Sequence, residues 1–155
     1  MTVRCVFLLC ACVLVGAAGC GSGRTIGGPG SVMPTAEVDF TTQIQPILNK
    51  NCALSGCHAA DTASGGMILD AGQAYSNLVN ATSTEVAPDK RVVPFNSAAS
   101  YIIEKLTHAQ PRSGDQMPRG SAPLPSDEIN LIKAWIDQGA KQSASTASRA
   151  LARPF

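Results

Sequence analysis

The chain has 155 residues, of which 45% are hydrophobic and 5% aromatic, with 12 basic and 11 acidic side chains and a net charge of +1. A net charge this close to zero argues against nucleic acid or an anionic surface as the partner. The length allows one small domain with a modest core, and a covalent cross-link or a bound cofactor would add considerably to its stability.

The N-terminal residues 1–19 have the features of an export signal. Arg4 supplies the positive start, and the apolar run 5–15 is too short to span a bilayer comfortably. Small residues then lead to Cys20, which resembles the lipobox of bacterial lipoproteins, where the cysteine is lipidated. We expect export to the periplasmic side of a bacterial membrane with a lipid anchor on Cys20. An ordinary secretory signal cleaved near Ala18 is the alternative.

Two segments of low complexity flank the expected domain. Residues 20–36 begin with the lipidated cysteine and continue mainly as Gly, Ser and Pro, which predicts a flexible tether with a reach of roughly 20–24 Å. Residues 143–155 are rich in Ser and Ala without apolar periodicity and predict a disordered tail. The folded domain is therefore expected at 37–142.

The first part of this domain predicts short helices separated by long loops, without a convincing alternating strand. Apolar residues at helical spacing within 40–48 predict a helix capped by Asp39, Thr41 or Thr42. Its regular part is expected to begin at Gln43 or later, because Pro46 belongs near a helix start. Asp70 is expected to cap a short helix that runs through Val79. The fold class expected is all-α.

Two more helices are predicted in the second part of the domain. Asn96 is expected to cap a helix over 98–106, with Tyr101, Ile102 and Leu106 on one face. The last helix is the clearest, with Ser126 as its cap and Gly139 as its stop. Its apolar face is formed by Ile129, Ile132 and Ile136, with Leu131 and Trp135 beside them.

The most informative motif is Cys52-Ala-Leu-Ser-Gly-Cys57-His58. Cys-x-x-Cys-His is the attachment signature of c-type haem, and here the spacer has four residues instead of two. Two thiols form thioethers with the haem vinyl groups, and the next residue supplies a neutral imidazole to the iron. Small Ser55 and Gly56 would let the longer spacer bulge outward. No hydrogen-bond acceptor that would orient His58 is identifiable.

Export leaves three interpretations of this motif open. Cys5, Cys10 and Cys12 leave with the signal, so Cys52 and Cys57 are the only thiols in the folded part, in a compartment that favours disulfides. The cysteines are a haem anchor, a disulfide in a haem-free binding or interaction domain, or a zinc site. The disulfide gives His58 no role, and zinc lacks a fourth ligand unless His108 comes close.

Several stretches together resemble a family of bacterial cytochrome c domains with this wider spacing. The resemblance implies a small all-α cytochrome c-like domain of short helices and long loops around one covalently bound haem c. Two departures are Ala59-Ala60 and Phe95, at positions where the family commonly has glycine. The resemblance covers nearly the whole expected domain and is carried by Phe40-Thr-Thr-Gln-Ile-Gln-Pro-Ile-Leu, Cys-x4-Cys-His, Tyr75-Ser-Asn-Leu-Val, Arg91-Val-Val-Pro, Ser100-Tyr-Ile-Ile-Glu-Lys-Leu, Met117-Pro118 and Trp135-Ile-Asp-Gln-Gly-Ala.

The resemblance places Met117 as the distal iron ligand opposite His58, and thioether sulfur is a suitable soft ligand. His108 is the rival, although an exposed position at a helix end is expected for it. Met67 is expected to anchor its loop. Arg91 is expected to be a solvated charge, and Tyr101 and Trp135 core residues.

The function expected is that of a membrane-tethered, single-haem electron carrier, because only one Cys-His dipeptide is present. With both axial positions filled the iron would have no open site, so an enzyme is not expected. No phosphate loop, nucleophile elbow or paired-carboxylate pattern is present either. The partners expected are redox proteins of unknown identity and the membrane, and not nucleic acid.

Overall fold

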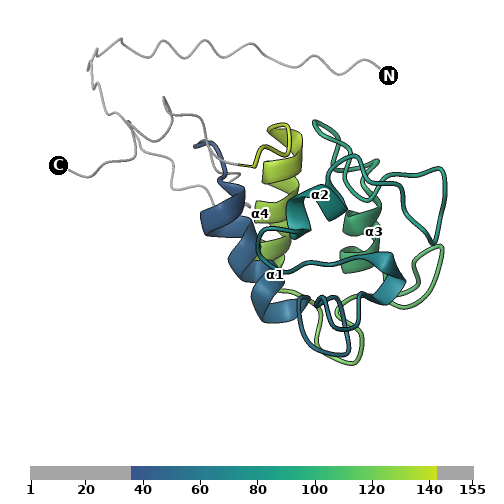
Figure 1. Cartoon of the computed structure of the whole chain (residues 1–155). Coiled ribbons are helices and arrows are strands. Elements are labelled where there is room, and N and C mark those ends of the chain that lie inside the picture. Colours follow the sequence, from purple (N-terminus) through teal and green to yellow (C-terminus); the bar gives the residue numbers. More distant parts are fainter. Residues whose placement is uncertain (1–35, 143–155) are drawn as a thin grey trace, which may run out of the picture. The chain divides into compact units, whose positions relative to one another are not determined.

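The computed structural model describes residues 36–142 (Figure 1). This part of the chain contains no named strand, only three isolated β-bridges, and the prediction of an all-α fold is confirmed at this level. None of its helices is both long and apolar enough to cross a membrane. The elements in order are a π-helical turn η1 (Phe40–Ile44), α1 (Gln45–Asn51), a 3-10 turn η2 (Ser64–Gly66), α2 (Ala74–Leu78), α3 (Tyr101–Thr107) and α4 (Ser126–Asp137).

The first helical segment begins as the sequence predicts, with Asp39 as its cap and a regular α-helical part that starts after Gln43. The Asp39 carboxylate accepts a hydrogen bond from the backbone amide of Thr42 at 2.9 Å, which caps the start of η1. The α-helical part then begins at Gln45 and places Pro46 in its first turn, where a missing N–H costs little. The segment ends at Asn51, immediately before the first cysteine of the motif.

Two predicted helix starts are wrong by several residues. Asp70 caps no helix, because its carboxylate instead accepts a hydrogen bond from the amide of Ala60 at 2.8 Å, and α2 begins only at Ala74. Asn96 accepts from the amide of Ala99 at 2.9 Å and so closes a turn that precedes α3. Short polar side chains can accept hydrogen bonds from backbone amides in turns and loops as well as at helix starts. Asp70 and Asn96 do so outside the helices here.

The last helix has nearly the predicted bounds, with a different cap. Ser126 is the first residue of α4, Pro125 precedes it, and no side chain caps this end. Gly139 ends the helix with a φ of +105°, a conformation that other residues rarely adopt. A Cβ atom at Gly139 would also lie only 2.6 Å from the ring of Phe95, so glycine is required there for two reasons.

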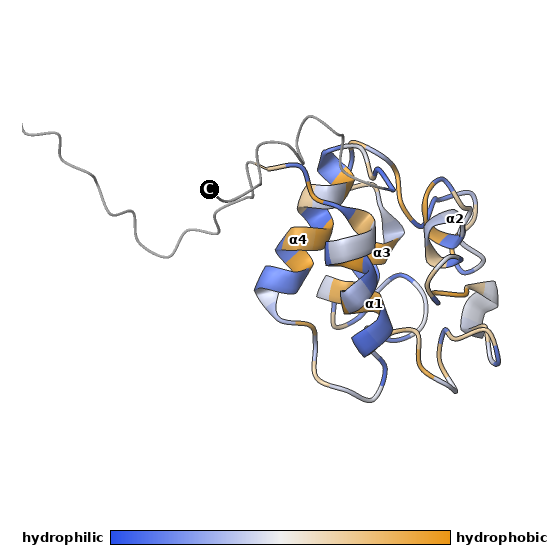
Figure 2. Ribbon diagram, turned by 60° about the vertical axis from the view of Figure 1, so that its left-hand side comes forward, coloured by the Kyte–Doolittle hydropathy of each residue, from blue (hydrophilic) through white to orange (hydrophobic). Residues whose placement is uncertain are grey.

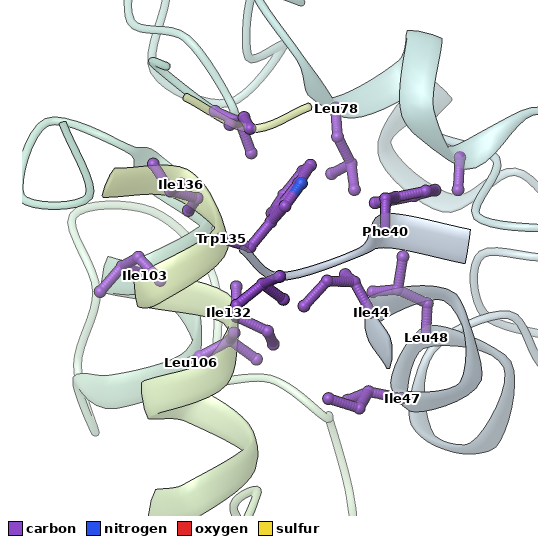
Figure 3. Packing of buried hydrophobic residues seen from close by; sticks show 14 of the residues in the cluster. Phe40, Ile44, Ile47, Leu48, Leu78, Ile103, Leu106, Ile132, Trp135 and Ile136 are labelled. Carbon is purple, nitrogen blue, oxygen red and sulfur yellow. The ribbon is translucent and has the colours of Figure 1, made fainter. Parts of the chain in front are cut away.

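The core lies between α4 and the first helical segment (Figure 3). Trp135 is its largest fully buried side chain, and its ring lies 5.1 Å from that of Phe40. Its indole N–H donates to the carbonyl of Lys141 at 2.7 Å. Hydrophobic and hydrophilic positions alternate along α4, as expected for a helix with one face in the core (Figure 2). Of the predicted apolar face, Ile132, Trp135 and Ile136 are buried, while Ile129 and Leu131 are partly exposed.

The buried face of α3 differs from the prediction by one position. Tyr101 and Leu106 are buried as expected, but Ile103 takes the place of Ile102, which is partly exposed. Lys105 is also buried, with only 8% of its surface exposed, and its polar partners are described below.

Candidate functional site

The cysteine motif forms a closed loop directly after α1. Cys52 is the C-cap of α1, and its amide donates to the carbonyl of Leu48 at 2.8 Å. The amide of His58 donates to the carbonyl of Cys52 at 3.1 Å, so the two ends of the motif meet. The four-residue spacer lies outside this contact, and Gly56 turns it with a φ of +81°. The helix end thus places both thiols and the imidazole on one short loop.

The spacer is fixed by polar contacts to the residues that follow His58. The hydroxyl of Ser55 donates to the carboxylate of Asp61 at 2.5 Å, and the amide of Gly56 donates to the hydroxyl of Thr62 at 2.9 Å. Hydrogen bonds from Ser55 and Thr62 lower the pKa of Asp61 and keep this carboxylate charged. The longer spacer is therefore a bulge of defined conformation, and its Leu54 side chain is 45% exposed.

The imidazole of His58 is oriented by a backbone carbonyl. Its Nδ1 atom lies 2.9 Å from the carbonyl oxygen of Ser64. A carbonyl only accepts hydrogen bonds, so Nδ1 carries a proton, and in the neutral imidazole Nε2 keeps a lone pair for a metal ion. This acceptor for His58 could not be identified from the sequence, because a backbone carbonyl in a Ser-Gly-Gly turn has no side-chain signature.

The thiols of Cys52 and Cys57 are free and partly buried. Burial raises the pKa of Cys52 to about 11, and the charges of Cys57 and Glu128 add to this effect. The site therefore disfavours a negative charge on the sulfur of Cys52. A thioether, which has no charge, suits these surroundings, whereas a thiolate would require a cation to offset it.

Arg91 is not the solvated charge that the sequence predicts. Its guanidinium donates to the carbonyls of Asn77 at 2.9 Å, Gly65 at 3.0 Å and Gly66 at 3.3 Å. Desolvation lowers the pKa of Arg91, although the charge of Glu85 opposes this effect. The guanidinium thus connects α2 to the turn that orients His58.

Met117 lies on a loop that is attached to α3 by hydrogen bonds. Its amide donates to the carbonyl of Lys105 at 2.8 Å, and the side-chain amide of Gln116 donates to the carbonyl of Leu106 at 3.1 Å. The Met117 side chain is partly buried and packs against the hydrophobic core, as does Cys52. Met67 also packs there, as expected for an apolar anchor of its loop.

A partly buried polar network fixes the start of the Met117 loop. The Tyr101 hydroxyl and the Lys105 ammonium both contact the carbonyl of Ser113, at 3.1 and 2.9 Å. Both groups also contact the carboxylate of Glu85, at 3.1 and 3.2 Å. Arg112 adds a cation over the Tyr101 ring at 5.4 Å. The sequence predicts a core position for Tyr101 but gives no sign of this network, because its partners are distant along the chain or belong to the backbone.

We expect the network to weaken at high pH. Burial, the hydrogen bond to Glu85 and nearby negative charges raise the pKa of Tyr101 from 10.0 to about 12. The folded state therefore favours the protonated phenol, a contribution that is complete below pH 10 and is lost as the pH rises towards 12. The free energy of unfolding, measured by denaturant titration, should fall less over this interval in Tyr101→Phe than in the native chain. Tyr75→Phe is the matched control, and its free energy of unfolding should fall by as much as that of the native chain. An equal fall in Tyr101→Phe would contradict the prediction.

Two other predicted site residues have different positions. His108 is exposed just after α3, and its ring lies 3.2 Å from the carbonyl of Glu104, so it satisfies the end of its own helix. Cys20, the predicted lipidation site, lies outside the described residues. The structure thus brings Cys52, Cys57 and His58 together, while Met117 reaches the same core from a separate loop.

Comparisons of the chain with protein-family models, with curated proteins and with solved structures find no match. Within residues 36–142 there is no group of three or more His, Cys, Asp and Glu side chains arranged to hold a metal ion. The site therefore has to be interpreted from its own geometry.

Proposed function

We propose that this domain is a single-haem c-type cytochrome, tethered to a bacterial membrane on the periplasmic side, that carries electrons between partner proteins. The observation that carries the proposal is the hydrogen bond from His58 Nδ1 to the Ser64 carbonyl. It leaves Nε2 of the neutral imidazole available on the same short loop as two thiols, the set of groups that covalent haem requires. Cys52 and Cys57 would hold the haem as thioethers, with His58 as the proximal and Met117 as the distal ligand.

The residues around the site have supporting roles in this proposal. Bound haem would supply a reversible one-electron couple. The Ser64 carbonyl holds the proton of His58 at Nδ1, and the burial of Cys52, which disfavours a thiolate, suits an uncharged thioether. The contacts of the Met117 loop with α3 hold its thioether against the core. With both axial positions taken, a carrier is a better interpretation than an enzyme.

A haem-free domain with a Cys52–Cys57 disulfide is the second candidate. It is favoured by the proximity of the two thiols, since the charge of Cys57 helps to raise the pKa of Cys52. This alternative explains both cysteines, but it leaves the oriented imidazole of His58 without a function.

A haem stain of the denatured protein distinguishes the two candidates. The full-length chain would be produced in a bacterium with an active cytochrome c maturation system. We expect the haem to stay with the polypeptide, and to be lost in a Cys52→Ala/Cys57→Ala double variant. The matched control Cys20→Ser should keep the haem and, if Cys20 is lipidated, should leave the membrane fraction. A folded, exported chain without haem would contradict the proposal and favour the disulfide.

A further inference from the structure

We infer that Arg91 is a positioning residue for His58, because its guanidinium holds the turn whose Ser64 carbonyl accepts the imidazole proton. The inference rests on the proposed function in so far as His58 is the iron ligand. The contacts form a continuous path from α2 through Arg91 and the turn to His58 Nδ1.

The turn that carries the Ser64 carbonyl needs support from outside. Ala63, Gly65 and Gly66 all have φ between +47° and +63°, and this region is unfavourable for a residue with a Cβ such as Ala63. The cysteine motif itself contacts the turn, because the amide of Ser64 donates to the carbonyl of Cys57 at 2.9 Å. No buried side chain comes from 63–66, so the hydrophobic core does not hold the turn.

Arg91 supplies this support from a well-anchored position. Its own amide donates to the carbonyl of Ala81 at 2.8 Å, and its carbonyl accepts from the amide of Ile102 at 3.1 Å, next to the start of α3. The side chain then reaches the carbonyls of Gly65 and Gly66 with one nitrogen. The hydroxyl of Thr84 donates to the Gly65 carbonyl as well, at 2.8 Å. The residue that follows Ser64 is thus held from two directions.

The chemistry of the guanidinium explains why arginine suits this place. Every hydrogen-bond acceptor that the structure gives it is a backbone carbonyl, and it makes no ion pair within residues 36–142. Its rigid planar guanidinium donates hydrogen bonds to carbonyls of two separate segments at once, which the single ammonium of lysine cannot do equally well. Partners of this kind fix both the ring orientation and the tautomer of a ligating histidine. Loss of the guanidinium should leave the Ser64 carbonyl less firmly positioned. The hydrogen bond that it accepts from the Nδ1 proton of His58 should weaken as a result.

Nitrogen NMR of the imidazoles in the full-length chain tests this inference in whichever haem state the chain is isolated. In the native chain we expect His58 as the Nδ1–H tautomer. In Arg91→Met the exchange of this proton with solvent should become about tenfold faster, the change expected for the loss of one hydrogen bond. Arg91→Lys should lie between the two.

The controls separate positioning from folding. Lys90→Met removes a charge at the adjacent position and should leave the His58 signal unchanged, because within residues 36–142 the ammonium hydrogen-bonds only to the hydroxyl of Thr82. The His108 signal is an internal reference in every spectrum. Unchanged proton exchange at His58 in folded Arg91→Met would overturn the inference; if that variant does not fold, unchanged exchange in Arg91→Lys would do so. Absence of haem would contradict the proposed function alone, since the imidazole measurement does not need it.

Discussion

Replacing Met117 by alanine is expected to abolish the sulfur-to-iron charge-transfer band of the oxidised, haem-loaded protein. The side chain is partly buried against the core, and its backbone is fixed to α3 through the carbonyl of Lys105. Alanine keeps this backbone contact and removes only the thioether. The reduction potential should fall as well, because methionine opposite histidine raises the potential of haem iron. Optical spectroscopy and a redox titration of the purified protein measure the two effects.

Met67 provides the matched control for this experiment. It is also partly buried and packs against the same core, so Met67→Ala removes a thioether at similar cost to packing. The band and the potential should persist in that variant. Retention of the band in Met117→Ala would exclude Met117 as the ligand and direct attention to His108, whose ring would then have to leave the carbonyl of Glu104.

Replacing Trp135 by alanine should cause the largest loss of stability in the domain. The side chain is 1% exposed, lies against Phe40 and donates a hydrogen bond to the carbonyl of Lys141. Truncation of a buried aromatic residue costs about 3–5 kcal/mol, a large part of the ~5–15 kcal/mol that holds a typical domain together. The free energy of unfolding from denaturant titration, with the native chain in the same haem state, measures this loss.

Phe95→Ala is the control for this truncation. Phe95 is 73% exposed, so the loss of its ring should change the free energy of unfolding by no more than about 0.5 kcal/mol. A similar small effect of Trp135→Ala would show that the contact between α4 and the first helical segment does not stabilise the domain.

The parts of the site that depend on side-chain chemistry could be predicted from the sequence. Cys52, Cys57 and His58 are recognisable because their residue types and order follow from thioether and imidazole chemistry, and the structure places them on one loop. The acceptor for His58 could not be found in this way. It is the backbone carbonyl of Ser64, and its position depends on the fold of a turn and on Arg91, which is distant in sequence.

The errors in the predicted helix starts have a related cause. Apolar periodicity located the last helix well, because α4 has a long face in the core. The starts of α2 and α3 were misplaced because Asp70 and Asn96 are equally suited to cap helices and to close turns, and the choice is made by tertiary contacts such as that between Asp70 and Ala60. Arg91 was misjudged for the same reason, since nothing in its local sequence shows that carbonyls surround it.

The two proposed iron ligands are held with unequal strength. The carbonyl of His58 accepts from the amide of Leu69, a fully buried residue, whereas no residue of 107–123 is buried and this segment is attached mainly by hydrogen bonds. Segments of this kind open at a smaller free-energy cost than the whole domain. If Met117 binds the iron, mild heat or denaturant would detach it while the core around Trp135 remains folded. The domain would then change its electronic state before it loses its shape, and a redox measurement would report damage that circular dichroism does not detect.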